Sequence, residues 1–160
     1  MAFLGPNNAI AWAGFRLRGG WKRSLIFTAG GVAILICLIV GGVRVDLAHA
    51  TRTLYNWSGG LLGLIAACLI LYVTARIAVA IRQDIQSRMI ESHRLMPVQP
   101  LEAVAGYISG AALQPIIFAA AIFIIGLFTS ARAAIAPDSW ALACAVLLAF
   151  AIFLWTLAAY

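Results

Sequence analysis

Charged residues are what this chain has least of. Eleven basic and five acidic residues make up 10% of its 160 positions, while hydrophobic residues make up 64%. Soluble proteins carry about 25% charged residues, which they need to cover their surface. This composition excludes an ordinary soluble domain and predicts a chain that lies mostly within a lipid bilayer.

The residue patterns of common active sites and metal sites are also missing. The sequence has no GxxxxGK[ST] phosphate-binding loop, and its histidines have no companion ligands nearby. No Ser/His/Asp or paired-carboxylate arrangement is present. The cysteines fall far apart within apolar stretches. We therefore predict neither enzymatic activity nor a metal or cofactor site in this chain. The residues concerned are His49, His93, Cys37, Cys68 and Cys144.

Long uncharged stretches are abundant, at 24–43, 53–75, 103–131 and 139–160. Roughly 20 apolar residues in a helix cross the hydrocarbon core of a bilayer. Membrane β-barrels would instead show in–out alternation, which is absent. The sequence predicts an all-α polytopic membrane protein of four transmembrane helices, at about 24–43, 59–81, 103–128 and 139–160.

The basic residues are distributed unevenly between the two sides of these spans. Eight flank the predicted inner ends (Arg16, Arg18, Lys22, Arg23, Arg76, Arg82, Arg88, Arg94) and three flank the outer ends (Arg44, Arg52, Arg132). Basic residues favour the cytoplasmic side. We expect an integral protein of a bacterial inner (plasma) membrane, with the N-terminus and the segment 82–102 in the cytoplasm.

Residues 1–23 mix aromatic, apolar and basic side chains. That mixture suits the headgroup region of a membrane. We predict an amphipathic interfacial helix that breaks at Gly19-Gly20 before the first span; a disordered basic leader is the alternative.

Several positions in the second and fourth spans carry more specific expectations. Gly59 and Gly63 predict close helix contact, after an outer connection over 44–57. Arg76 either snorkels to the inner surface or faces a cavity. Asp138 or Ser139 is expected to cap the fourth helix. Its Trp140 is expected at the outer interface.

The third span combines Gly106 and Gly110 with Gln114-Pro115 near its middle. The glycines permit close packing, and proline frees the carbonyl of residue 111. A kinked, closely packed helix is predicted. Gln114 makes either an interhelical hydrogen bond or a contact with cargo.

The segment 82–102 is the one substantial polar stretch. Its charges pair at helical spacing, as in Asp84–Arg88 and Glu91–Arg94, opposite an apolar face. Pro97 ends this helix, and Pro100 starts the next. The resulting corner suits either a mechanical coupling element or an inert loop.

Glu91, Pro97 and Gly106 follow a definite order: an acidic helix, a proline, and nine residues later a glycine that opens the next span. This order resembles the cytoplasmic loop of type-2 ABC transporter permeases, and the basic N-terminus resembles their elbow helix. The chain departs from that family at two places in this loop: Tyr107 stands where the family has lysine, and Arg88-Met89 stand where it has Gly-Thr. It also shows four spans, whereas the family has six.

The resemblance implies the permease subunit of an ABC exporter, paired with a second permease copy or paralogue. Cytoplasmic ATP-binding subunits would hold the ATP and dock on 82–102. The implied coupling residues are Asp84, Arg88, Glu91, Arg94 and Pro97. Because the chain stops at Tyr160 within an apolar run, it is expected to be an N-terminal fragment. The alternative is a membrane scaffold or assembly protein whose loop binds another partner.

Overall fold

The computed structural model describes residues 16, 20–86 and 100–159. Its regular elements are helices: α2 (Gly20–Val45), the short η1 (Leu47–His49), α3 (Ala50–Ala66), the π-helical η2 (Ala67–Tyr72), α4 (Val73–Gln86), α6 (Pro100–Arg132) and α7 (Pro137–Ala158). Four segments within them are long and apolar enough to cross a membrane. The prediction of four transmembrane helices is confirmed at this level.

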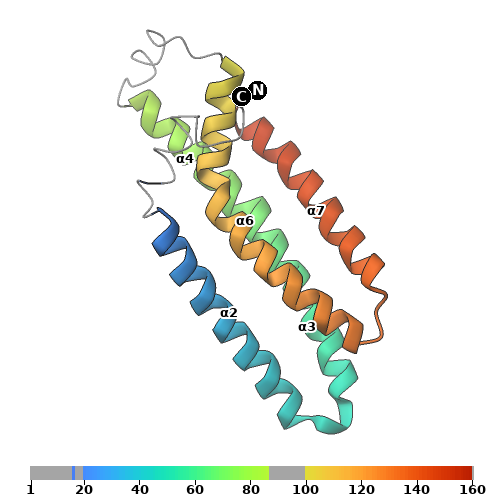
Figure 1. The fold of residues 1–160 in the computed structure, drawn as a ribbon. Coiled ribbons are helices and arrows are strands. Elements are labelled where there is room, and N and C mark those ends of the chain that lie inside the picture. The colour runs from blue at the N-terminus through green and yellow to red at the C-terminus, as the bar shows by residue number, and fades with distance from the viewer. Residues whose placement is uncertain (1–15, 17–19, 87–99, 160) are drawn as a thin grey trace.

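The helices form an antiparallel bundle (Figure 1). At one end of the bundle, α2 and α6 begin and α4 and α7 finish; we call it the basic end. The opposite end is called the loop end. α6 contacts α2, α3, α4 and α7, whereas α2 and α7 do not contact each other. α6 is therefore the central helix of the described bundle.

The second and third transmembrane segments are longer than a bilayer needs. The chain is helical without interruption from Ala50 to Gln86, and α6 has 33 residues. At 1.5 Å per residue these helices measure about 55 and 50 Å, against about 30 Å of hydrocarbon. Part of the excess in the second segment lies at the loop end, because residues 50–58 are helical but precede the apolar run over 59–81.

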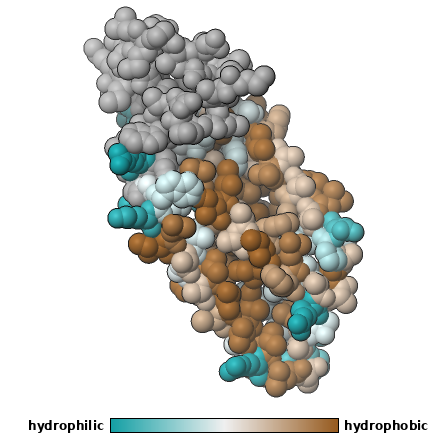
Figure 2. Space-filling model, in the orientation of Figure 1, coloured by the Kyte–Doolittle hydropathy of each residue, from teal (hydrophilic) through white to brown (hydrophobic). Residues whose placement is uncertain are grey.

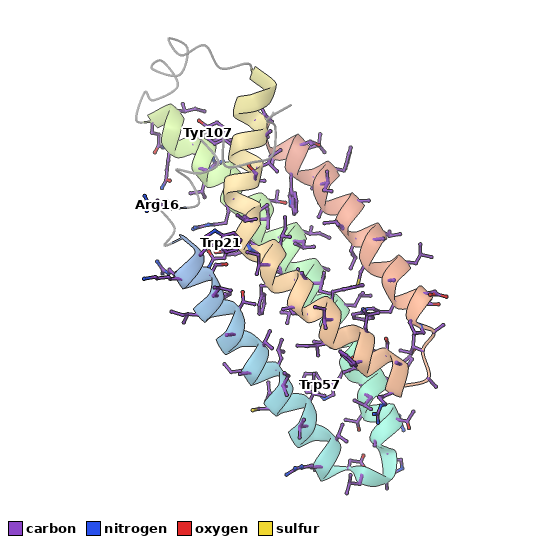
Figure 3. The ribbon with its side chains drawn as sticks, viewed as in Figure 1. Arg16, Trp21, Trp57 and Tyr107 are labelled. Atoms are coloured by element: carbon purple, nitrogen blue, oxygen red, sulfur yellow. The ribbon has the colours of Figure 1, made fainter. Side chains whose placement is uncertain are left out.

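The predicted connection over 44–57 is wrong in its length. Only Asp46 and η1 separate α2 from α3, because residues 50–58 contain neither proline nor a helix-terminating glycine. Asp46 accepts a hydrogen bond from the His49 ring over 3.0 Å in this connection. Trp57, labelled in Figure 3, packs beside Gly42 of α2.

The other connection, residues 133–136, closes α6 with a positive-φ residue, Ala134 (φ 59°). The Ile135 amide donates to the Ser130 carbonyl at 2.9 Å, the six-to-one bond of a Schellman motif. α7 then begins at Pro137 with Ala136 as its N-cap and no side-chain capping bond. The predicted cap at Asp138 or Ser139 is wrong, because Pro137 already occupies the first helical position.

A separate interfacial helix is not shown. Residues 20–23, which we assigned to it, form the first turn of α2, and residues 1–15 and 17–19 lie outside the described part. Gly20 has φ +59°, a left-handed conformation that glycine adopts without steric cost.

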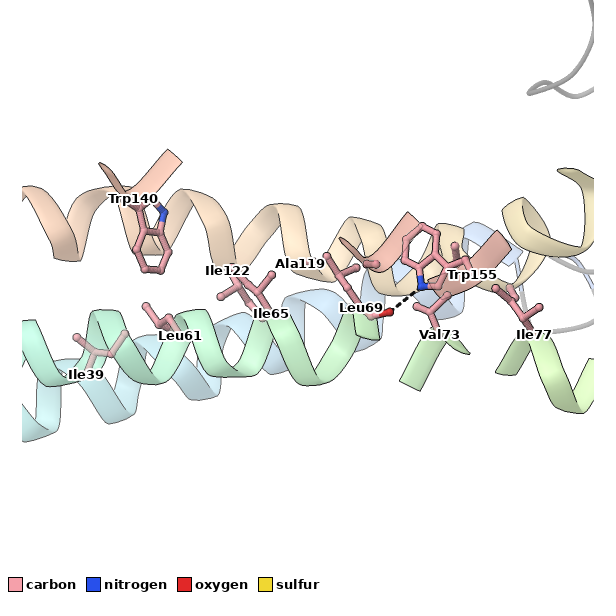
Figure 4. Close-up of a cluster of buried hydrophobic side chains, with 13 residues drawn as sticks. Ile39, Leu61, Ile65, Leu69, Val73, Ile77, Ala119, Ile122, Trp140 and Trp155 are labelled. Atoms are coloured by element: carbon pink, nitrogen blue, oxygen red, sulfur yellow. Dashed lines mark hydrogen bonds between the residues drawn. The ribbon is translucent and has the colours of Figure 1, made fainter. Parts of the chain in front are cut away.

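The interior is one apolar cluster along α6 and its neighbours (Figure 4). It comprises Ile39, Leu61, Ile65, Leu69, Val73, Ile77, Ala111, Ala112, Ala119, Ile122, Trp140, Ala151 and Trp155. Large apolar side chains also remain exposed, notably on α2 and α7. Figure 2 shows them covering the middle of the visible face. Such exposure is what contact with lipid requires.

Candidate functional site: a cavity between α2, α4 and α6

A cavity of about 780 Å³ opens between α2, the α3–η2–α4 helix and α6. Pockets of about 300–1,000 Å³ are typical of small-molecule sites. Its lining residues are Arg23, Phe27, Leu64, Ala67, Cys68, Tyr72, Arg76, Gln114, Pro115 and Phe118. They come from all three walls, so the cavity exists only because these helices pack together.

Two cations face this cavity. Arg23 lies in the first turn of α2, and Arg76 lies on α4 with its guanidinium 5.7 Å from the centre of the Tyr72 ring. That distance suits a cation–π contact. Of the two alternatives left open by the sequence, the structure therefore places Arg76 at a cavity.

Neither arginine is neutralised by a carboxylate whose side chain the structure describes. Among those side chains the ion pair is His49–Asp46, in the connection at the loop end. An arginine is charged at every physiological pH, so the described lining is positive.

Gln114 adds an amide to the same lining. Within the described part of the chain its side chain has no hydrogen-bond partner. The predicted interhelical bond is therefore not observed there. The amide provides two N–H donors and one acceptor to whatever occupies the cavity.

Three residues with hydroxyl groups lie close in the chain to residues of the lining. Ser24, Thr28 and Thr74 have buried hydroxyl oxygens without a partner among the described residues. Each lies within two positions of a lining residue. Buried polar groups normally find partners, so this region of the bundle has an unused capacity for hydrogen bonding.

The opposite part of the lining is apolar. The rings of Phe27 and Phe118 meet edge to face with centroids 5.6 Å apart. Gly31 permits this approach, because a Cβ there would lie 2.7 Å from the Phe118 ring. The cavity thus has a cationic, polar portion and an aromatic, apolar portion.

Irregular backbone forms two of the walls. The π-helix η2 supplies Ala67, Cys68 and Tyr72, and Pro115 interrupts the hydrogen-bond ladder of α6 opposite. The Cys68 thiol donates a weak hydrogen bond to the Pro115 carbonyl at 3.9 Å. π-Helical turns within α-helices occur often at functional sites.

The buried face of this helix explains the π turn. Leu61, Ile65, Leu69, Val73 and Ile77 are buried at intervals of four residues. In a regular α-helix, four residues turn about 40° beyond one full turn, so residues spaced by four move gradually around the helix. The wider turn of η2 offsets part of that drift and keeps the row on the core.

Of the residues predicted for packing and hinge motion, all four lie in α6. Gly106, Gly110 and Pro115 are buried, and Gln114 is half-buried. α6 passes through Pro115 as one helix. The structure thus brings Gln114 and Pro115 into the cavity lining, while Gly106 and Gly110 lie nearer the basic end.

The predicted coupling residues lie at and beyond the end of α4. Asp84 lies in the last turn of α4. Arg88, Glu91, Arg94 and Pro97 lie outside the described residues.

Sequence reasoning assigned no role in a cavity to Arg23, Tyr72 or Cys68. The sequence places Arg23 among the basic residues that set the topology and in the interfacial segment 1–23, and it indicates an ordinary apolar side chain at Cys68. The repeated four-residue spacing from Leu61 to Ile77 was the one available sign of an irregular helix here.

A scan of known protein families, a search of curated proteins and a search of solved structures each found no match to this chain.

Proposed function

We propose that this chain is the membrane-spanning permease subunit of an ABC exporter, driven by ATP that a separate cytoplasmic subunit hydrolyses. One observation carries the proposal. The segment 82–102 includes the end of α4 and the start of α6, and both of these helices line the cavity. A partner that moves this segment therefore acts on two cavity walls at once.

The helices can transmit such a movement over the distances involved. Arg76 lies ten residues before the end of α4, and Gln114 lies fourteen residues after the start of α6. These intervals correspond to about 15 and 21 Å of helix. A helix moves as a stiff rod over such lengths, so displacement at the basic end reaches the cavity.

The irregular backbone provides places where the walls can bend. Helix kinks occur mainly at prolines and π turns. Here η2 and Pro115 lie at the level of the cavity, between the segment 82–102 and the loop end. Movement of that segment would then open or close the cavity while the loop end stays fixed.

A second permease copy or paralogue would complete the route for cargo. The exposed apolar faces of α2 and α7 leave room for further helices as well as lipid. The scaffold alternative shares these faces but gives the cavity and its flexible walls no role.

Affinity purification from the native membranes tests the proposal. We expect the tagged chain to retain an ATP-binding subunit that carries a phosphate-binding loop. Glu91→Lys, within the segment 82–102, should reduce its recovery at least several-fold. Arg52→Glu reverses an exposed charge on α3 at the loop end and serves as the control that should leave recovery unchanged.

Two results would contradict the proposal. If no ATP-binding protein accompanies the chain, a scaffold is the better account. If Glu91→Lys abolishes transport but leaves ATPase recovery intact, the docking role of the segment 82–102 is wrong.

A further inference from the structure

The chemistry of the cavity identifies a class of ligand. We propose that it binds a phosphate-bearing lipid, with Arg23 and Arg76 contacting the anionic headgroup and the aromatic wall receiving part of an acyl chain. This inference goes beyond the proposed function, because such a site could serve a transporter or a scaffold and binding needs no ATPase.

The first argument is charge. Two guanidinium groups from different helices line one cavity, and no described carboxylate side chain neutralises them. Bringing like charges together within a membrane protein is unfavourable unless an anion accompanies them. Arginine is also the side chain best suited to phosphate, because its planar N–H groups bind two oxygens at once.

The second argument is hydrogen bonding. The Gln114 amide lies in the same lining without a partner among the described residues. Phosphate and glycerol oxygens of a lipid headgroup would supply acceptors for its two N–H donors.

The third argument is depth. Arg23 is the fourth residue of α2, so it lies about 5 Å from the start of that helix. Trp21 of α2 and Tyr107 of α6, labelled in Figure 3, lie at this same end. Aromatic rings of this kind favour the headgroup region. Arg23 therefore lies where a headgroup lies, and Arg76 lines the same cavity. Phe27, Leu64 and Phe118 extend the lining toward the acyl chains.

Free phosphate would satisfy the arginines but not the apolar wall. The size of the cavity, about 780 Å³, also exceeds what a phosphate ion occupies. A lipid uses both portions of the lining, and we therefore assign the site to the lipid.

Native mass spectrometry of the full chain in a neutral detergent tests this assignment. The probes are phosphatidylglycerol, phosphatidylcholine with identical acyl chains, and inorganic phosphate. We expect the anionic lipid to bind at least tenfold more tightly than the zwitterionic one. Each arginine contributes roughly fivefold to this preference. Arg23→Gln together with Arg76→Gln should therefore lower the preference to about unity.

Arg132→Gln is the matched control, because it removes one exposed arginine from the loop end of α6. It should retain the preference. Thermal unfolding monitors the fold of every variant. If the double variant does not fold, Arg23→Gln alone, at an exposed position, should still lower the preference roughly fivefold.

Three outcomes would overturn the proposal. The first is equal affinity for the two lipids in the unmodified chain. The second is an equal loss of preference in Arg132→Gln and in the cavity variants. The third is inorganic phosphate binding as tightly as phosphatidylglycerol, which would assign the site to a free anion.

Discussion

At the scale of single residues, the glycines of this chain divide by their surroundings. A Cβ at Gly126 would overlap the ring of Trp140, which is buried. By contrast, Gly59 and Gly63 have nothing within 4 Å of such an atom. The predicted close contact at Gly59 and Gly63 is therefore wrong within this chain, whereas Gly126 makes a close contact between α6 and α7.

Gly126→Ala should destabilise the protein by about 1–3 kcal/mol, because the added methyl group displaces the Trp140 ring from a packed position. Denaturant unfolding in mixed micelles would measure the loss. Gly59→Ala is the control and should have little effect or a slightly stabilising one, since alanine favours helix. Equal stability of the two variants would show that the Trp140 ring moves at no cost.

The charge of the cavity should be detectable at Cys68, which lines it. The test uses a variant with Cys37→Ser and Cys144→Ser, in which Cys68 is the remaining cysteine. We measure the rate at which an anionic methanethiosulfonate modifies the protein, divided by the rate for a cationic one. We expect this ratio to be roughly tenfold higher at Cys68 than at a free thiol in solution. The arginines raise the local concentration of anions, so Arg76→Gln should reduce the ratio. A ratio in the parent equal to that of the free thiol would contradict a positive cavity.

At the scale of helices, a hydrogen bond joins the π-helix η2 to α7. The Trp155 indole N–H donates a buried hydrogen bond of 2.8 Å to the Leu69 carbonyl, drawn in Figure 4. Leu69 lies within η2, where the wider turn alters the backbone hydrogen bonds. This bond ties α7 to the cavity wall on the side that faces the core.

Trp155→Phe should destabilise the bundle by roughly 1 kcal/mol, because the buried carbonyl loses a donor in a medium without water. Thr156→Val is a matched control. The Thr156 hydroxyl donates to the Phe153 carbonyl of its own helix and is exposed, so its loss should cost less. Reversible unfolding of both variants in mixed micelles gives the comparison, and equal losses would show that the bond between helices has no special weight.

At the scale of the whole molecule, orientation in the membrane follows from charge. The basic end is predicted to face the cytoplasm. In a cysteine-free background, a membrane-impermeant maleimide should label Ala136→Cys in intact cells. It should label Gln86→Cys only after permeabilisation. Both positions are exposed, at opposite ends of the bundle. The reverse pattern would place the segment 82–102 outside and remove the basis for a cytoplasmic ATPase.

Within the described part of the chain, the sequence alone determined the four helices that are long and apolar enough to cross a membrane, and much of their extent. Hydrophobic length is a local property that can be read directly, and Pro100 marks the start of α6 as predicted. The limits of the second helix were less accurate, because residues 50–58 continue the helix although they precede the apolar core of the span.

Only the tertiary structure decided which face of each helix meets a neighbour. Lipid is as apolar as the protein interior, so composition does not separate lipid-facing from buried positions. Trp140 illustrates this: its type predicts the interface, but its ring is buried against Gly126. The cavity has the same origin, because Arg23, Arg76 and Gln114 lie far apart in the chain. Helix packing brings them together, and no local pattern in the sequence records that.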